Sequence, residues 1–415
     1  MPDISCRPPV SRAPSLLRAS GLAALLMLGA CAARDTPPRT PVAAAIPKVA
    51  LPLDEAVMRL AEATLSGEKN IPPDARRTIV IDPLIDRTSG AETATTRSIS
   101  ARIESLIRDK HPELQLKPFT TASLDEKPLI LLGAITTVTE AGSLTNSTGP
   151  SDTYRIWAVL GDLETGTILS HPTAWVSAET VDATPTSFFR SSPVWTADEA
   201  QAAYLRTCAG APGTPMDEAY LRGLRAQAVV AEGIQAYERG DFVSALDFYK
   251  QADGEPGGQQ SRVLNGLYLA NWDLGRRGAA RVAFGRVVDY GLERNRLALK
   301  VLFRPGSTAF VRNRGVSAAY PMWLEEIAWH VADREACLRI VGHTSVTGAS
   351  MVNERLSLAR AYAVRVRLVQ NAPLLRDRSE ALGRGSKEPI VGLGTDDMRD
   401  ALDRRVEFTP HQCRA

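Results

Sequence analysis

The sequence predicts a multidomain α/β and α protein, in which two α/β domains are joined by a helical segment. Strand and helix patterns alternate over residues 51–195 and again over residues 296–415, while residues 196–295 carry a helical pattern that repeats. A length of 415 residues fits two to four domains. Hydrophobic residues make up 44% of the chain and charged residues 23%, which excludes collagen-like and wholly disordered proteins.

Residues 1–30 have the order of a secretion signal. Three arginines precede an apolar run at 21–29 that is too short to span a bilayer, and the run ends in Leu-Gly-Ala before Cys31. This segment resembles the lipobox of bacterial lipoproteins. The resemblance implies cleavage before Cys31, lipidation of Cys31 and sorting to the outer membrane. A generic signal peptide with a chance cysteine is the alternative.

Residues 31–50 predict a tether, because they contain four prolines and little hydrophobic periodicity. A polyproline-like segment of this length would reach roughly 60 Å. Such a tether would hold the folded domains in the periplasm, away from the outer-membrane surface. The anchor itself would be stable, because two or three acyl chains hold a protein in a membrane, whereas one is marginal.

Charge is unevenly distributed along the chain. The formal net charge is +2 overall, and it falls to zero once residues 1–30 are removed. Residues 296–415 carry 19 Lys and Arg against 13 Asp and Glu, and 17 of those 19 are Arg. A nearly neutral chain excludes a strongly basic nucleic-acid binder, so no nucleic-acid partner is expected. The mildly basic C-terminal part suits an anionic polymer.

Residues 51–195 are predicted to form the first α/β domain. Apolar residues recur at helical spacing from Leu53 to Ala61, and a second amphipathic helix follows at 95–110. The predicted strands cover 77–85, 114–119, 128–137, a hairpin of 154–163 with 167–170, and 174–180, and a flexible loop is expected at 141–151.

Four short motifs in this domain are similar to a domain of periplasmic lipoproteins, including the curli-secretion lipoprotein and the penicillin-binding-protein activators. The motifs are Val80-Ile81-Asp82-Pro83, Ser89-Gly90 before a helix, Leu132-Gly133-Ala134-Ile135-Thr136 and Asp162-Leu163-Glu164-Thr165-Gly166. The resemblance implies assembly or protein contacts rather than catalysis. An unrelated small α/β domain is the alternative.

Residues 196–295 show an internal repeat of 35 residues. The repeated pairs are Tyr237 and Trp272, Gly240 and Gly275, Ala245 and Ala280, Tyr249 and Phe284, and Ala252 and Val287. This pattern resembles tetratricopeptide repeats, whose period is 34, and implies glycine turns between paired helices. Flanking helices at 197–206 and 288–299 are expected to cap the two units. A plain pair of helical hairpins is the alternative.

Residues 296–415 contain the most specific pattern. Predicted strands at 298–303, 337–342 and 379–383, and a last one after Asp403, alternate with helices at 321–334 and from Asn353. The pattern itself is Gly342-His343-Thr344, Gly348, Asn353, Leu356-Ser357 and Arg360-Ala361. It resembles the OmpA-like peptidoglycan-binding domain. The resemblance implies a βαβαβ fold and, as the ligand, the diaminopimelate stem peptide of peptidoglycan.

The same resemblance implies a set of binding residues. Arg360 matches the family arginine that binds a carboxylate of diaminopimelate, and Asn353 matches the asparagine that orders the adjoining loop. The other candidates are Thr347 in the turn, Gly306 near the first strand, Arg405 on the neighbouring strand, and Ser345. Asn353 and Arg360 are two helical turns apart, so they share a face.

The opposite face of this helix is expected to point to the core. Four of its apolar residues are spaced for such a stripe: Leu356, Ala359, Ala363 and Val366.

Ser345 departs from the family pattern, which usually has aspartate at this position. Serine can donate or accept a hydrogen bond but brings no charge. Loss of a charge-assisted contact costs on the order of 1.5–3 kcal/mol. Weaker wall binding, binding of a different stem chemistry, and a scaffold domain that no longer binds all stay open.

Cysteine spacing predicts a disulfide between Cys337, which opens one strand, and Cys413, which follows the last strand. If the two strands are antiparallel with their ligand ends together, the cysteines meet at the far end. Two separate thiols are the alternative. Cys208 lies in a predicted Gly/Pro-rich linker without an evident partner. No Cys/His spacing of a zinc site occurs, so no metal and no cofactor are expected.

The sequence contains no complete catalytic motif. His343, Ser345 and Asp403 would be the members of an imagined triad, but no nucleophile elbow or oxyanion turn accompanies them. Residues 383–386 lack the spacing of a phosphate loop. The sequence therefore predicts a protein that is not an enzyme.

Together these features predict an outer-membrane-anchored periplasmic lipoprotein that binds peptidoglycan non-covalently and tethers or scaffolds the cell envelope. Protein partners are expected through residues 51–295. The alternative is a wall-localised assembly factor or a regulator of a peptidoglycan synthase or secretion machine. In that alternative the OmpA-like domain serves only for localisation.

Overall fold

The computed structural model describes residues 49–66, 77–138, 153–196, 198–304, 306–312, 317–334, 336–390, 394 and 403–413. The predicted signal, the lipidation site at Cys31, most of the tether and the loop predicted at 141–151 lie outside the described residues. None of the described helices is long and apolar enough to cross a membrane.

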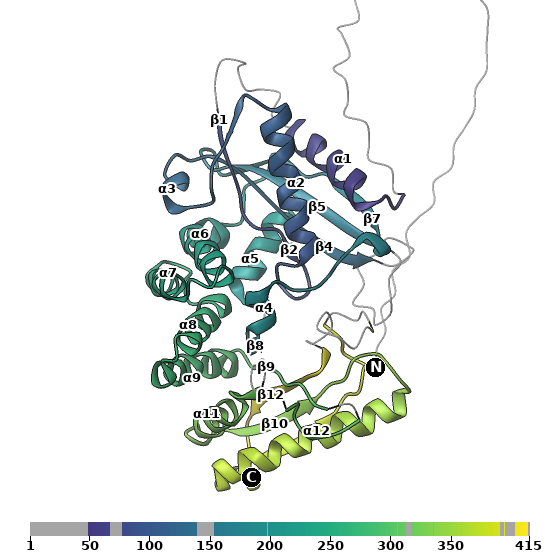
Figure 1. The fold of residues 1–415 in the computed structure, drawn as a ribbon, viewed down its shortest axis with the longest axis vertical. Coiled ribbons are helices and arrows are strands. Elements are labelled where there is room, and N and C mark those ends of the chain that lie inside the picture. The colour runs from purple at the N-terminus through teal and green to yellow at the C-terminus, as the bar shows by residue number, and fades with distance from the viewer. Residues whose placement is uncertain are drawn as a thin grey trace, which may run out of the picture. The chain divides into compact units, whose positions relative to one another are not determined.

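The first sheet is mixed (Figure 1). Its strand order is β3-β1-β4-β5-β6, with β2 beside β4 and β7 beside β5. The strands β1, β2, β3 and β4 pair in parallel, whereas β5 pairs antiparallel with β4, β6 and β7. The bounds are β1 Arg77–Ile81, β2 Ile85–Asp86, β3 Leu114–Leu116, β4 Leu129–Val138, β5 Thr153–Asp162, β6 Thr167–Ser170 and β7 Thr173–Ser177. The strand predicted at 174–180 thus ends early, in a 3₁₀ turn at Ala178–Thr180.

Alternate residues of these strands face two helical layers. Ile79 and Leu131 pack in a cluster with α1 (Leu53–Leu65) and α2 (Ala94–Lys110). Val80 and Leu132 face the other way, into a cluster with α5 (Glu199–Cys208) and the first half of α6 (Glu218–Glu238). The short helix α3 (Thr121–Leu124) adds Leu124 to this cluster. This alternation follows from the period of two along a strand.

The prediction that Cys208 lies in a linker was wrong. Cys208 is fully buried at the end of α5, whose Ala203 and Tyr204 are buried against the first sheet. The helix α5 is the one predicted at 197–206 to cap the repeats. It packs on the first sheet and also on α6, where the ring centroids of Tyr204 and Tyr220 lie 5.9 Å apart.

Four helices follow: α6 (Glu218–Glu238), α7 (Phe242–Gly254), α8 (Ser261–Asp273) and α9 (Arg277–Glu293). The predicted glycine turns are confirmed, because Gly240 and Gly275 have φ angles of 79° and 73° in the connections α6–α7 and α8–α9. The helix predicted at 288–299 is wrong. The helix α9 runs to Glu293, and strand β9 begins at Leu297.

The second sheet has the order β11-β10-β12-β9-β8, in which only β10 and β11 pair in parallel. Its C-terminal elements are β9 Leu297–Lys300, α11 Tyr320–Ala332, β10 Cys337–Gly342, α12 Ser350–Asn371, a 3₁₀ turn at Pro373–Arg376, β11 Ser379–Gly383 and β12 Arg405–His411. The fifth strand, β8 (Val194–Trp195), follows helix α4 (Ser187–Ser191). The predicted first domain, residues 51–195, includes this segment, whereas the structure pairs it with β9.

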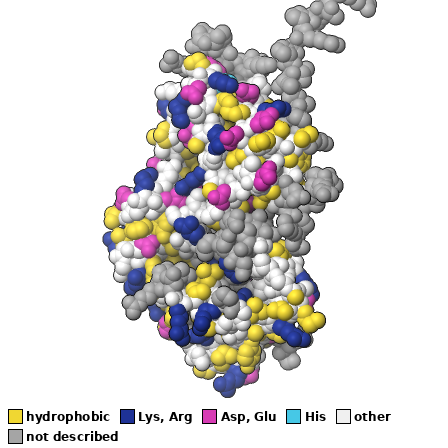
Figure 2. All heavy atoms as spheres, turned by 45° about the vertical axis from the view of Figure 1, so that its right-hand side comes forward, with side chains coloured by type: hydrophobic (Ala, Val, Ile, Leu, Met, Phe, Trp, Pro, Cys, Tyr) yellow, Lys and Arg dark blue, Asp and Glu magenta, His cyan; other side chains and the backbone are white. Residues whose placement is uncertain are grey.

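The helices α8 and α9 share one hydrophobic cluster with this second sheet. Phe284 of α9 stacks on Trp323 of α11 with ring centroids 5.7 Å apart, and the Trp323 Nε1 donates to the Tyr268 hydroxyl at 2.8 Å. Figure 2 shows acidic and basic side chains mixed on the visible face of the protein.

The C-terminal strands β10 and β12 run antiparallel, with Cys337 opposite His411. Cys413, two residues beyond His411, forms a disulfide with Cys337. The pairing that sequence spacing suggested is therefore the one in the structure.

The expected core stripe of α12 was wrong. Ala359 and Val366 are exposed, and Leu356 and Ala363 are only half-buried. The buried stripe is Asn353, Ser357, Arg360, Ala361, Val364 and Leu368. The face that carries the two candidate binding residues is thus the same face that packs on the sheet.

Candidate binding cleft

A cleft of about 270 Å³ lies beside the end of β10 and the first turns of α12. It brings together Gly306, Ser345, Thr347, Asn353 and Arg360, which are five of the six residues predicted from sequence. The other residues that line it are Leu302, Phe303, Val311, Thr344, Leu356 and Arg404.

The turn after β10 forms one wall of the cleft. The Thr344 backbone N–H donates to the Gly385 carbonyl at 2.9 Å, which ties the turn to the end of β11. The Asn353 Nδ2 donates to the Thr347 carbonyl at 2.9 Å, and the Ser345 and Thr347 hydroxyls lie 2.9 Å apart. Asn353 therefore shapes the turn from the helix.

Arg360 forms the floor of the cleft and is only 5% exposed. Its Nε donates to the Ser307 carbonyl at 3.2 Å, and its guanidinium carbon lies 4.8 Å from the centre of the Phe303 ring. An arginine stacked on an aromatic ring is held in orientation and presents its planar edge for a bidentate contact with a carboxylate.

Arg405 is not among the residues that line the cleft. It is 3% exposed, its Nε donates to a Glu407 carboxylate oxygen at 2.7 Å, and a terminal nitrogen donates to the Glu388 carbonyl at 3.0 Å. Its neighbour Arg404 lines the cleft instead. Sequence reasoning missed Arg404, Thr344 and Phe303, and only Thr344 carried a signal, since it belongs to the recognised Gly-His-Thr segment.

Thr344 contributes a buried polar group to the cleft. The residue is 3% exposed, and its hydroxyl oxygen has no hydrogen-bond partner among the described residues. A buried hydroxyl without a partner costs about 1–3 kcal/mol. A bound ligand could supply that partner.

His343 does not form a catalytic arrangement. Burial, followed by the nearby positive charge of Arg405, lowers its pKa to about 3, so the imidazole is neutral. Neither ring nitrogen has a hydrogen-bond partner, and carboxylate oxygens of Glu388 and Glu407 at 3.9 Å pair only with a protonated ring. Asp403 accepts from the Ile390 N–H at 2.7 Å, which is a structural role.

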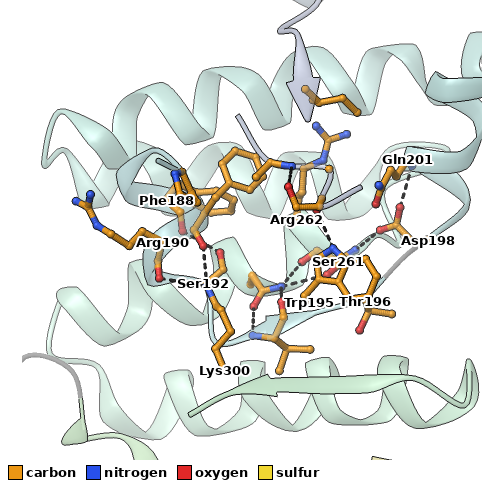
Figure 3. A pocket seen from close by; sticks show the side chains of 18 of the residues that line it. Phe188, Arg190, Ser192, Trp195, Thr196, Asp198, Gln201, Ser261, Arg262 and Lys300 are labelled. Atoms are coloured by element: carbon orange, nitrogen blue, oxygen red, sulfur yellow. Dashed lines mark hydrogen bonds between the residues drawn. The ribbon is translucent and has the colours of Figure 1, made fainter. Parts of the chain in front are cut away.

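A separate cavity lies where α4, β8, α5, α8 and β9 meet (Figure 3). The Lys300 Nζ donates to the carbonyls of Phe189 and Arg190 at 2.7 and 3.1 Å, and burial lowers the pKa of Lys300 to about 7. The Asp198 carboxylate accepts from the Ser261 N–H at 2.8 Å. Because these polar groups already have partners within the protein, the cavity is a junction between elements.

No cluster of three potential metal-ligating residues occurs within the part of the chain that the structure describes.

Comparison with known proteins gives partial matches. No family model matches the chain. Among curated proteins, 74 residues are 42% identical to the outer membrane protein Omp38 of two strains of Acinetobacter baumannii. The match covers 18% of this chain and 20% of Omp38, so the chain spans about a fifth of the length of the curated relatives it matches.

Solved structures match a similar share of this chain. The peptidoglycan-associated lipoprotein of Burkholderia pseudomallei is 27% identical over 27% of this chain and 88% of that chain, with a TM-score of 0.23. The cell wall anchor of the T6SS from Pseudomonas aeruginosa is 23% identical over 28% and 81%, with a TM-score of 0.24. An outer membrane protein of Borrelia burgdorferi B31 is 24% identical over 28% and 86%, with a TM-score of 0.22.

Proposed function

We propose that this protein is an envelope lipoprotein that binds peptidoglycan non-covalently through the cleft at Arg360. The observation that carries the proposal is the convergence of Arg360, Asn353 and the Thr344–Thr347 turn on one cleft. The sequence resemblance to OmpA-like domains supports it. The partial identity with an outer membrane protein supports an envelope location.

The binding mechanism follows from the chemistry of the cleft. A carboxylate of the stem peptide accepts two hydrogen bonds from the guanidinium edge of Arg360. Phe303 keeps that edge in place from below, and Asn353 keeps the opposite wall in place through Thr347. The apolar side chains of Val311 and Leu356 contact the aliphatic part of the ligand. The role is binding, and no bond is made or broken.

Co-sedimentation with purified diaminopimelate-type peptidoglycan tests the proposal. The full protein is expected to sediment with the wall material, and Arg360→Ala is expected to lose at least tenfold in affinity, because one charge-assisted contact disappears. Arg355→Ala is the matched control, since Arg355 is an exposed arginine of the same helix that does not line the cleft. Equal sedimentation of both variants would contradict the assignment.

Lipidation of Cys31 is the second part of the proposal, and it gives the molecule its tether. The Cys31→Ser variant is expected to leave the outer-membrane fraction and to lose incorporation of labelled palmitate. Unchanged fractionation would show that the wall-binding cleft alone holds the protein in the envelope.

An assembly factor that only uses the wall for localisation is the second candidate. A groove of about 960 Å³ between α2 and α6 favours it, because its walls combine apolar side chains with charges of both signs. Arg97 of α2 pairs there with Glu92 and with Glu238 of α6. A photo-crosslinker at Gln235, an exposed residue in the groove, is expected to capture a defined partner that the same crosslinker at Arg222 does not.

A further inference from the structure

The side of α12 that faces away from the second sheet is apolar. Ten large hydrophobic side chains of the described residues are exposed, and six of them lie between positions 351 and 374. Five of these six are on α12, which lies at the outer border of the C-terminal elements in Figure 1. Their exposed fractions range from 37% for Val366 to 65% for Met351. Single exposed hydrophobic residues are ordinary, whereas a cluster of them marks an interaction surface.

These side chains form a continuous outer seam along the helix. The outer seam consists of Met351, Val352, Leu358, Ala359, Tyr362 and Val366. Val352, Ala359 and Val366 follow one another at intervals of seven residues, and Met351 and Leu358 have the same spacing. A seven-residue spacing keeps an apolar seam in line with a neighbouring helix over several turns. The outer seam therefore fits a second helix.

A groove beside the outer seam has room for such a helix. It has a volume of about 490 Å³ and lies between α12 and β11, with Leu358 and Tyr362 on one side and Ser379 and Ala381 on the other. Strand β11 is the edge strand of the second sheet, so the described sheet ends at this groove. Packed helices lie about 8–10 Å apart, which brings a helix in this groove into contact with the outer seam.

The charge on this side of α12 favours one direction for the second helix. Arg355 is exposed and lines the groove among the apolar side chains. In a parallel pair of identical helices, Arg355 would face its own copy, and like charges repel. In an antiparallel pair centred between Leu358 and Ala359, Arg355 instead lies opposite Tyr362 of the second copy. A guanidinium is attracted to the face of such a ring.

We propose that the outer seam binds the outer seam of a second copy of this chain, with the two α12 helices antiparallel. A two-fold axis makes every contact twice, so that Met351 lies opposite Val366 at both ends. One helix face from each copy belongs to the class of interfaces under about 1,200 Å², which form weak complexes. Two copies held by the lipid anchor proposed at Cys31 would meet at a high effective concentration, which favours the pair.

Single cysteines on the outer seam test this arrangement in cells that produce the full protein. The native cysteines of the described chain do not interfere, because Cys337 and Cys413 are joined and Cys208 is buried, and the wild type is the blank. Leu358→Cys is expected to give a dimer with a short bis-maleimide, because both copies of this position flank the axis. Met351→Cys alone is expected to give less than a tenth as much, since its two copies are roughly 22 Å apart along the pair.

Co-production of two variants provides the decisive comparison. Met351→Cys and Val366→Cys together should give the mixed dimer, because these positions face each other only in the antiparallel pair. Val243→Cys is the matched control, since Val243 is 54% exposed on α7 and lies outside the outer seam. It should give no more dimer than the wild type.

A charge placed beside the axis should separate the two copies. Adding Leu358→Glu to both partners is expected to lower the yield of the mixed dimer at least tenfold, because two carboxylates would be buried next to each other. Val243→Glu should leave the yield unchanged. Leu358 is 46% exposed, so its substitution leaves the core intact, and thermal melting verifies that the variants are folded.

The outcomes distinguish a second copy from other partners. Equal yields from Met351→Cys and Leu358→Cys would indicate a parallel pair and overturn the antiparallel one. No dimer from Leu358→Cys would show that a membrane surface or another protein covers the outer seam, and would overturn the proposal altogether. Neither result affects the proposed wall binding, because Asn353 and Arg360 belong to the buried stripe of α12.

Discussion

Arg404 and Arg405 are adjacent in the chain, yet their side chains lie in different surroundings. Arg404 lines the cleft, whereas Arg405 is buried and paired with Glu407. The sequence alone does not show which of these two consecutive arginines faces the cleft. That depends on the register of β12 against β10 and β9, because a shift by one residue exchanges the two faces.

Alanine substitutions are expected to separate the two arginines. Arg405→Ala leaves Glu407 without its partner and should lower the free energy of unfolding by about 3 kcal/mol. Arg404→Ala should change stability by less than about 1 kcal/mol and weaken wall binding instead. Urea denaturation and co-sedimentation measure the two effects. A stability loss for Arg404→Ala as large as that for Arg405→Ala would contradict the assignment.

His343 should make the folded state sensitive to acid. Its pKa is about 3 in the folded state and 6.5 ordinarily, so below pH 6.5 the unfolded chain binds a proton that the folded chain does not. Stability is therefore lost as the pH falls from about 6.5 toward 3, by about 2 kcal/mol at pH 5. The charged groups around the ring are Arg296, Arg384, Glu388, Arg405 and Glu407.

Urea denaturation at pH 7.5 and pH 5 measures this effect. The His343→Gln variant should lose about 2 kcal/mol less than the wild type between the two pH values. The two proteins are compared by the change in their free energy of unfolding between the two pH values, because the substitution also changes stability at neutral pH. His330→Gln is the control, since His330 is only part-buried and is paired with Asp289. Parallel slopes for wild type and His343→Gln would disprove the neutral buried imidazole.

The strand β10 and the helix α12 approach each other closely at Gly342. A Cβ placed there would lie 2.1 Å from the Ser357 carbonyl oxygen, which is backbone and cannot move aside cheaply. Gly342→Ala is therefore expected to lower the free energy of unfolding by more than about 2 kcal/mol. If the clash pushes β10 and α12 apart, the cleft between them changes shape, and wall binding is expected to weaken as well.

Gly278→Ala is the matched control for this substitution. Gly278 lies in the first turn of α9, where an added Cβ meets nothing within 4 Å, and alanine favours helix. That variant should be neutral or more stable by up to about 1 kcal/mol. Thermal or urea unfolding of both variants decides the matter, and equal effects would show that the close approach at Gly342 is not a constraint.

Helix α12 shows that apolar periodicity alone does not predict which face of a helix is buried. Two stripes run along it, one apolar and one that mixes polar and apolar residues, and the sequence favoured the apolar one, which contains Ala359 and Val366. The structure buries the other one, which includes Asn353, Ser357 and Arg360. Polar residues on a buried face are readable only after their partners are known, here the Thr347 and Ser307 carbonyls and the Gly385 N–H.

The disulfide links the start of β10 to the chain just after the end of β12. It joins Cys337 and Cys413, which are 76 residues apart. Closing a loop of that size in the unfolded chain stabilises the fold by about 2–4 kcal/mol. The Cys337→Ser/Cys413→Ser variant should lose that amount, and reduction of the wild type should reproduce the loss. Cys208 is buried and unbridged, so Cys208→Ser should not change the response to reductant.

Sequence alone determined the order of most helices and strands, because amphipathic spacing, glycine turns and the Gly-His-Thr pattern are local properties of the chain. It located Arg360 and Asn353 on one helix face, and it suggested the partner of Cys337. The tertiary structure alone decided which face of α12 is buried, which arginine of 404–405 enters the cleft, and that α5 covers the first sheet. These depend on contacts between residues far apart in sequence, which no local pattern encodes.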